Sequence, residues 1–99
     1  MVERVVFLPA ASRDLEEAYR WYEGRSPGLG LEFTRSVDAC LGNIRRNAEL
    51  YEVVFKQYRR AMVRRFPFAI FYKLSNRVIT VYSVFHCSQD PAKWHNRLP

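Results

Sequence analysis

The chain has 99 residues, of which 48% are hydrophobic and 15% aromatic. That composition supports one packed domain over residues 1–99 and excludes both a disordered chain and a second domain. The 16 Lys and Arg residues outnumber the 10 Asp and Glu residues, and the excess lies in residues 51–99, which carry 9 cations against 2 anions.

The first predicted elements are a strand and a helix. Residues 3–8 form a short β run that Pro9 ends. Ser12 is the predicted cap of the helix, because acidic residues crowd the turns after it, and Gly24 is the predicted stop. One face carries apolar residues at helical spacing, namely Leu15, Ala18, Tyr19 and Tyr22. The acidic residues Asp14, Glu16 and Glu17 are expected along a solvated flank.

A second helix follows after a short connection. Ser26 is its predicted N-cap, with Pro27 at the first helical position, and it is expected to end near Asn47. Its buried face recurs at steps of three and four residues and comprises Leu29, Phe33, Val37, Cys40, Leu41 and Ile44. The short connection predicts an antiparallel helical hairpin.

After Tyr51 the apolar pattern changes to the two-residue period of strands. The predicted strands cover residues 58–64, 68–74 and 77–86, and the last is nearly all apolar, as expected for a central strand. Asp90-Pro91 then begins a short turn or helix that carries Trp94. The order is β-α-α-β-β-β, an α+β fold with a helical hairpin packed on one face of a mostly antiparallel sheet.

Two pairs of arginines flank the first of these strands. Adjacent strand residues point to opposite faces, so Arg60 and Arg64 are expected on the outer face and Arg59 on the inner face. Lys73 adds to the outer face, and no Asp or Glu occurs between Val53 and Gln89. A solvated sheet face and a surface for an anionic partner both fit this pattern.

Aromatic residues interleave with these cations, at Tyr58, Tyr72 and Tyr82. Such aromatics occur at surfaces that bind single-stranded RNA, and they also occur in any half-buried strand. His86, at the end of the last strand, is either a structural hydrogen-bonding residue or an acid–base group, with Arg64 or Arg65 as a phosphate clamp. His86, Cys87, Asp90 and His95 match no common zinc spacing. No metal or cofactor is expected.

Several segments, taken in order, resemble the ParE-type toxins of the RelE/ParE superfamily. They are Phe7-Leu8-Pro9-Ala10-Ala11 with Asp14-Leu15, Tyr22-Glu23 with Ser26-Pro27-Gly28-Leu29-Gly30 and Phe33, Arg64-Arg65-Phe66-Pro67-Phe68, Ile70-Phe71-Tyr72-Lys73, and His86 with Asp90-Pro91 and Trp94. The resemblance implies a bacterial toxin of a type II toxin–antitoxin pair, neutralised by a cognate antitoxin whose C-terminal segment wraps it. ParE-like members poison DNA gyrase, whereas RelE-like members cut mRNA on the ribosome.

The resemblance favours a gyrase inhibitor over a nuclease. In many relatives Arg stands where this chain has Ser88 or Gln89, and no Lys or Glu base stands beside the strand-end His86. Two alternatives remain: a decayed toxin that retains only antitoxin binding, and a RelE-like, ribosome-dependent mRNA endonuclease. The nuclease would use Arg64, Arg65, Tyr72 and His86.

Partner contacts are expected from seven residues: Tyr19, Tyr22, Arg59, Arg60, Arg64, Tyr72 and Trp94. No apolar run reaches the length of a membrane span, and no signal peptide is visible. A cytoplasmic location is therefore expected.

Overall fold

The computed structural model describes residues 2–89 and 91–99, with only the backbone of Trp94. Five strands form one sheet: β1 (Arg4–Phe7), β2 (Val53–Phe55), β3 (Tyr58–Met62), β4 (Phe68–Ser75) and β5 (Val78–His86). The helices are α1 (Pro9–Arg25), α2 (Leu29–Asn47) and α3 (Pro91–Arg97). None of the helices in the described part of the chain has both the length and the apolarity needed to cross a bilayer.

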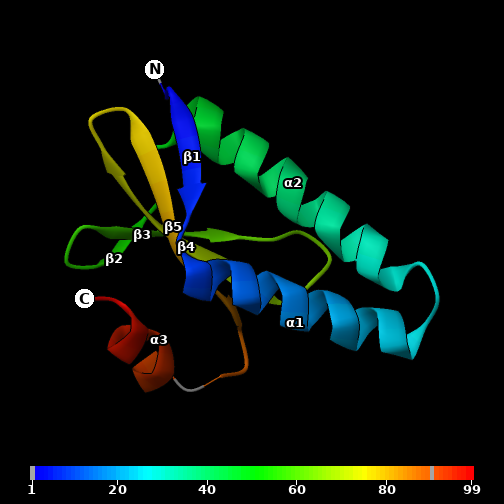
Figure 1. The fold of residues 1–99 in the computed structure, drawn as a ribbon. Coiled ribbons are helices and arrows are strands. Elements are labelled where there is room, and N and C mark those ends of the chain that lie inside the picture. The colour runs from blue at the N-terminus through cyan, green and yellow to red at the C-terminus, as the bar shows by residue number, and fades with distance from the viewer. Residues whose placement is uncertain (1, 90) are drawn as a thin grey trace.

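The sheet confirms the predicted α+β architecture. Its strand order is β1-β5-β4-β3-β2, and only β1 pairs in parallel, with β5. Figure 1 shows α1 and α2 as a V on one side of the sheet, joined at residues 26–28 and diverging toward β1. The structure adds β2, which is too short to show a two-residue period, and it resolves the C-terminal segment as α3.

The strands alternate between two apolar clusters. Phe68, Ile70 and Tyr72 of β4 point into the main core beneath the helices, as their spacing predicts. Ala69 and Phe71 point to the other face, where they meet Phe85 and a second cluster under the C-terminal segment. The outer face of the sheet was expected to be a basic surface. That prediction is wrong for this part of the sheet, because apolar side chains and α3 cover it.

The predicted start of α1 is wrong. The helix begins at Pro9, where the missing N–H costs nothing, and Ser12 lies inside it with its N–H donated to Leu8 O at 3.1 Å. It also passes Gly24 and ends at Arg25. Asp14 is not on a solvated flank, because its side chain is 15% exposed and faces β5 and α3.

The predicted cap of α2 is also wrong. Gly28, at φ +90°, takes the N-cap position instead of Ser26, and only glycine adopts that φ without strain. The carboxylate of Glu23 on α1 accepts the N–H groups of Gly28 at 3.0 Å and Gly30 at 3.0 Å. The last turn of α1 therefore caps α2, which satisfies two helix N–H donors and fixes the hairpin.

Candidate functional site

Tyr72 is a core residue and not a surface residue. Its side chain is fully buried, and its hydroxyl donates a hydrogen bond to Ala48 O at 2.7 Å. Burial raises the pKa of Tyr72 to about 12, so the phenol holds its proton. In this conformation the Tyr72 side chain is closed to solvent, and its predicted partner contact and proton transfer remain predictions.

The arginines of β3 point to opposite faces, as predicted. Arg59 lies on the inner side, where it donates to Glu49 O at 3.0 Å and Tyr51 O at 2.6 Å and fastens the α2–β2 connection. Arg60, on the outer face, pairs with Glu52 at 2.8 Å. Both guanidinium groups thus already have partners within the chain. Partner contacts through Arg59 and Arg60 remain a prediction.

The nuclease residues predicted from the sequence do not line one hollow. His86 and Arg60 line a hollow of about 310 Å³ on the outer face of the sheet. Arg64 and Arg65 line a different hollow, of about 280 Å³, beside α2. The strands place His86 opposite Phe68, and Arg64 and Arg65 lie in the turn between β3 and β4.

His86 is held by local contacts. Its ring packs edge-on against Phe68, with centroids 5.1 Å apart. Its Nδ1 accepts the backbone N–H of Ser88 at 3.1 Å, so the neutral ring carries its proton on Nε2. The Ser88 hydroxyl lies 2.6 Å from the same nitrogen. His86 therefore presents a donor, and its acceptor nitrogen is occupied.

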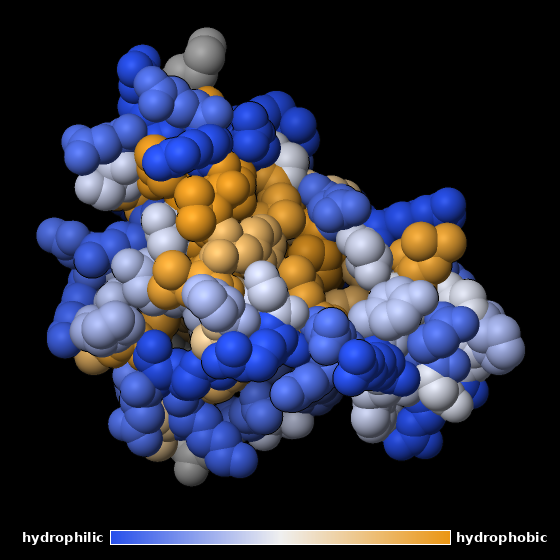
Figure 2. Space-filling view, in the orientation of Figure 1, coloured by the Kyte–Doolittle hydropathy of each residue, from blue (hydrophilic) through white to orange (hydrophobic). Residues whose placement is uncertain are grey.

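The angle between α1 and α2 holds an apolar groove of about 460 Å³. Figure 2 shows it as a continuous apolar hollow in the V of the hairpin. Its floor comes from Leu15 and Tyr19 of α1 and from Phe33, Val37 and Leu41 of α2. Glu16 and Asp38 stand on its sides, so the groove has an apolar floor and acidic walls.

The two tyrosines of α1 have different roles. Tyr19 is 40% exposed and lines the groove, so its predicted partner contact is compatible with the structure and remains a prediction. Tyr22 is buried and packs against Phe33 and Phe66, with ring centroids at 5.2 and 4.9 Å. A partner contact by Tyr22, which is 8% exposed, remains a prediction. The side chain of Trp94 lies outside the described residues.

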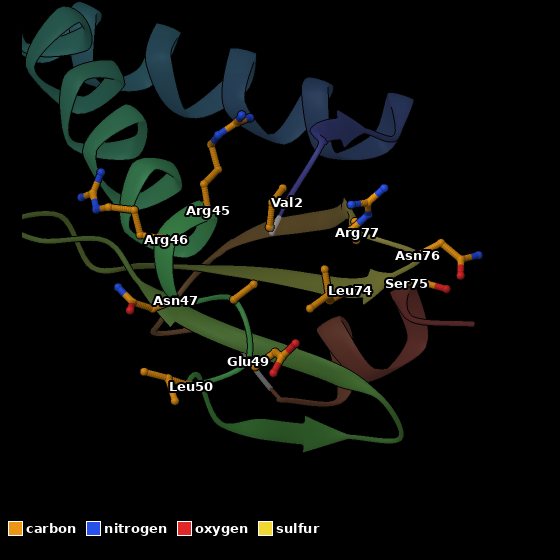
Figure 3. A pocket seen from close by; sticks show the side chains of 11 residues that line it. Val2, Arg45, Arg46, Asn47, Glu49, Leu50, Leu74, Ser75, Asn76 and Arg77 are labelled. Carbon is orange, nitrogen blue, oxygen red and sulfur yellow. The ribbon is translucent and has the colours of Figure 1, made fainter.

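Another hollow, of about 590 Å³, lies at the C-terminal end of α2. Figure 3 shows Arg45 and Arg46 extending from the helix in different directions, with Arg77 across the hollow at the β4–β5 turn. Arg77 is paired with Glu3, and Arg46 donates to Asn43 Oδ1 at 2.6 Å. Because these cations diverge, the hollow is no convergent anion site. Within residues 2–89 and 91–99, no group of three or more His, Cys, Asp or Glu side chains is placed to hold a metal ion.

The sequence pattern did not reveal the groove. Helical spacing predicted Leu15 and Leu41 as buried core residues, but both are only half-buried because they line the groove between α1 and α2. The carboxylate of Glu23 was also missed as the cap of α2. Its position five residues before Gly28 was the available signal.

Comparison with known families agrees with this architecture. Residues 5–91 match the family model described as the ParE toxin of the type II toxin–antitoxin system parDE. The chain belongs to the ParE toxin family. The resemblance inferred from the sequence is thereby confirmed.

A solved structure has the same fold as this ParE family member. It is described as the chromosomal ParDE TA system from P. aeruginosa, and it aligns with a TM-score of 0.68 at 14% identity. The alignment covers 87% of this chain and 96% of the other. Among curated protein sequences, none matches significantly.

Proposed function

We propose that this ParE family member inhibits DNA gyrase by binding it, without cutting RNA, and that a cognate antitoxin neutralises it in the bacterial cytoplasm. The observation that carries the proposal is the dispersal of the nuclease residues. Tyr72 is buried under the helices, and Arg64 and Arg65 line a different hollow from His86. Acid–base catalysis needs its groups within hydrogen-bond reach of one substrate, and this arrangement does not provide that.

The groove between α1 and α2 is the proposed antitoxin site. Its apolar floor fits the apolar stripe of an amphipathic helix, a common way of binding a peptide. The walls carry Glu16 and Asp38, so the bound segment should place Lys or Arg beside that stripe. The groove is therefore complementary to a basic amphipathic helix.

The gyrase proposal is tested with purified components. Free protein added to gyrase, ATP and relaxed plasmid should reduce supercoiling in proportion to its concentration, and antitoxin added beforehand should restore supercoiling. A trapped complex of gyrase with cleaved DNA would be a second positive result. Unchanged supercoiling without cleaved DNA would contradict the proposal, provided that circular dichroism shows a folded toxin.

The antitoxin site is tested with two exposed aromatics on the same helix. Tyr19 lines the groove, whereas Trp21 is 56% exposed and does not line it. Tyr19→Ala should weaken binding of the antitoxin encoded beside the toxin gene, by about tenfold or more for a buried aromatic contact. Trp21→Ala is the matched control. Equal losses from both variants in calorimetry would place the antitoxin elsewhere.

A ribosome-dependent mRNA endonuclease is the second candidate, and one observation favours it. Arg60 and His86 line the same hollow, and His86 presents an Nε2 donor. A guanidinium and an imidazole together suit a phosphodiester. Cleavage of mRNA in a translating extract, abolished by His86→Ala, would support this candidate.

A further inference from the structure

A second groove runs along α2 and has a basic rim. It is a hollow of about 280 Å³ between α2 and the end of β3, and we call it the arginine groove. Arg35, Ser36 and Asn43 line it from the helix, and Met62, Arg64 and Arg65 line it from the opposite side. No Asp or Glu is among its lining residues.

The arginine groove lies on the opposite side of α2 from the antitoxin groove. Successive helical residues are rotated by about 100° around the axis. Residues 33, 34, 37, 38 and 41 face the antitoxin groove, and residues 35, 36, 39, 40 and 43 face the arginine groove. The two sets are centred roughly 200° apart. One side of α2 thus carries acidic walls and the other a basic rim.

The cations of this rim are available to a partner. Arg65 pairs with Glu32 at 2.9 Å, which ties the β3–β4 turn to α2. In the described part of the chain, neither Arg35 nor Arg64 forms an ion pair or a side-chain hydrogen bond. The pair with Glu32 indicates that this rim binds carboxylates, which arginine contacts in a planar, bidentate way.

The turn that presents Arg64 and Arg65 is fixed by its backbone. Val63 N–H donates to Phe68 O at 2.9 Å, and Phe68 N–H donates to Phe66 O at 2.7 Å. Arg65 has φ +71°, a left-handed conformation that a non-glycine residue seldom adopts. This conformation and the two backbone hydrogen bonds hold Arg64 and Arg65 beside α2.

The floor of the arginine groove is apolar. It consists of Ala39 and Cys40, with Met62, 51% exposed, beside them. Burial raises the pKa of the Cys40 thiol to about 11, so the floor carries no thiolate near neutral pH. Its one aromatic, Tyr51, is half-buried and gives no open stacking platform for a nucleotide base. A flexible methionine instead suits an aliphatic side chain.

We propose that the arginine groove binds an acidic peptide segment of a partner protein. Carboxylates of the segment pair with Arg35 and Arg64, and an aliphatic side chain between them packs on Met62. This proposal is independent of gyrase inhibition and of the antitoxin groove, because it concerns a different face of α2. A partner that occupies both grooves would hold α2 from two sides, with a basic helix on one and an acidic segment on the other.

The test uses a fluorescein-labelled synthetic peptide with a Leu flanked on both sides by Glu and Asp. Fluorescence anisotropy should show saturable binding that weakens with added salt. Arg35→Gln and Arg64→Gln should each weaken it about tenfold, as expected for a charge-assisted hydrogen bond. The matched control is Arg13→Gln, which also removes an exposed charge but from α1, outside all of the hollows described above, and should leave affinity unchanged.

Backbone NMR shifts caused by the peptide should centre on Ser36, Ala39 and Asn43. An absence of saturable binding would overturn the proposal. An equal loss from Arg13→Gln would also overturn it, because attraction to net charge alone would then suffice. If a single-stranded oligonucleotide binds more tightly and displaces the peptide, the ligand of the arginine groove is a nucleic acid and the proposal is overturned. All four proteins can be checked for folding by circular dichroism, since each substituted arginine is exposed.

Discussion

The carboxylate of Asp14 on α1 accepts two hydrogen bonds from the guanidinium of Arg97 on α3, at 2.9 and 3.2 Å. The same carboxylate accepts the backbone N–H of Val84 on β5 at 3.0 Å. One side chain therefore joins the helical hairpin, the inner strand β5 and the C-terminal helix. Arg97 also lies over the ring of Phe85, 4.9 Å from its centroid. Each partner of the ion pair is therefore held by β5, Asp14 through Val84 and Arg97 through Phe85.

Removal of this carboxylate should destabilise the domain. Asp14→Ala leaves Arg97 and the Val84 N–H without their acceptor in a site where Asp14 is 15% exposed. The expected cost is about 1–3 kcal/mol in the free energy of unfolding, measured with urea. Glu17→Ala, on the exposed face of the same helix, should change it by less than about 0.5 kcal/mol. Similar values for both variants would mean that the Asp14–Arg97 contact contributes little.

Tyr72 and Cys40 should make the domain sensitive to alkali. Burial raises the pKa of Tyr72 from 10.0 to about 12 and that of Cys40 from 9.0 to about 11. At a pH between the unfolded and the folded pKa of each group, the folded state keeps a proton that the unfolded chain has lost. Stability is thus complete below the unfolded pKa values, near pH 9, and falls as the pH rises toward 12.

Tyr72→Phe tests this sensitivity. At neutral pH the variant should lose about 1 kcal/mol, because the hydrogen bond to Ala48 O is removed. Between about pH 10 and 12 it should lose less stability than the wild type, because one of the two titrating groups is gone. Tyr19→Phe, at an exposed tyrosine, should follow the wild-type curve. Urea unfolding at neutral pH and at about pH 11 gives the comparison. Parallel curves for Tyr72→Phe and wild type would contradict it.

Two glycines of α2 should respond differently to alanine. At Gly42 a new Cβ meets only the guanidinium of Arg46, at 3.6 Å, so Gly42→Ala should stabilise the domain by about 0.5–1 kcal/mol. At Gly30 the new Cβ would lie 2.8 Å from the ring of Tyr19. Gly30→Ala must therefore displace that ring, and it should gain less stability or lose some. Equal stabilisation of both variants in urea unfolding would show that Tyr19 moves freely.

Gly30→Ala also probes the antitoxin groove. The ring that it displaces lines this groove, so the variant should bind antitoxin less tightly even where its stability is unchanged. Gly42→Ala is the control for binding as well, because Gly42 lines none of the hollows described above. Isothermal titration calorimetry measures the affinity of each variant for the antitoxin. Unchanged affinity of Gly30→Ala would indicate that the antitoxin does not contact Tyr19.

Sequence periodicity predicted the parts of the fold that depend on local alternation. The alternation of β4 and most of the buried helix positions follow from spacing, because each element must bury its apolar side. Spacing did not predict that Leu15 and Leu41 are half-buried or that Tyr19 is exposed.

Contacts between residues far apart in the sequence could not be predicted from periodicity. Asp14 looked solvated because Arg97, its partner, lies 83 residues away. The sequence also did not show that β4 lies between β5, which carries His86, and β3, which leads to Arg64.

His86→Ala separates the two candidate functions. If the chain acts by binding gyrase, the variant should still arrest growth when expressed without antitoxin, because the contacts of His86 within residues 2–89 and 91–99 are local ones, with Phe68 and Ser88. Loss of the ring should cost about 1 kcal/mol of stability, too little to unfold most domains. If the chain is a nuclease, the same variant should lose toxicity and mRNA cleavage while it stays folded. Ser88→Ala refines the result, because it removes only the hydroxyl beside Nδ1 and leaves the imidazole in place. Growth arrest by wild type and both variants, with intact mRNA in each culture, agrees only with the non-enzymatic mechanism.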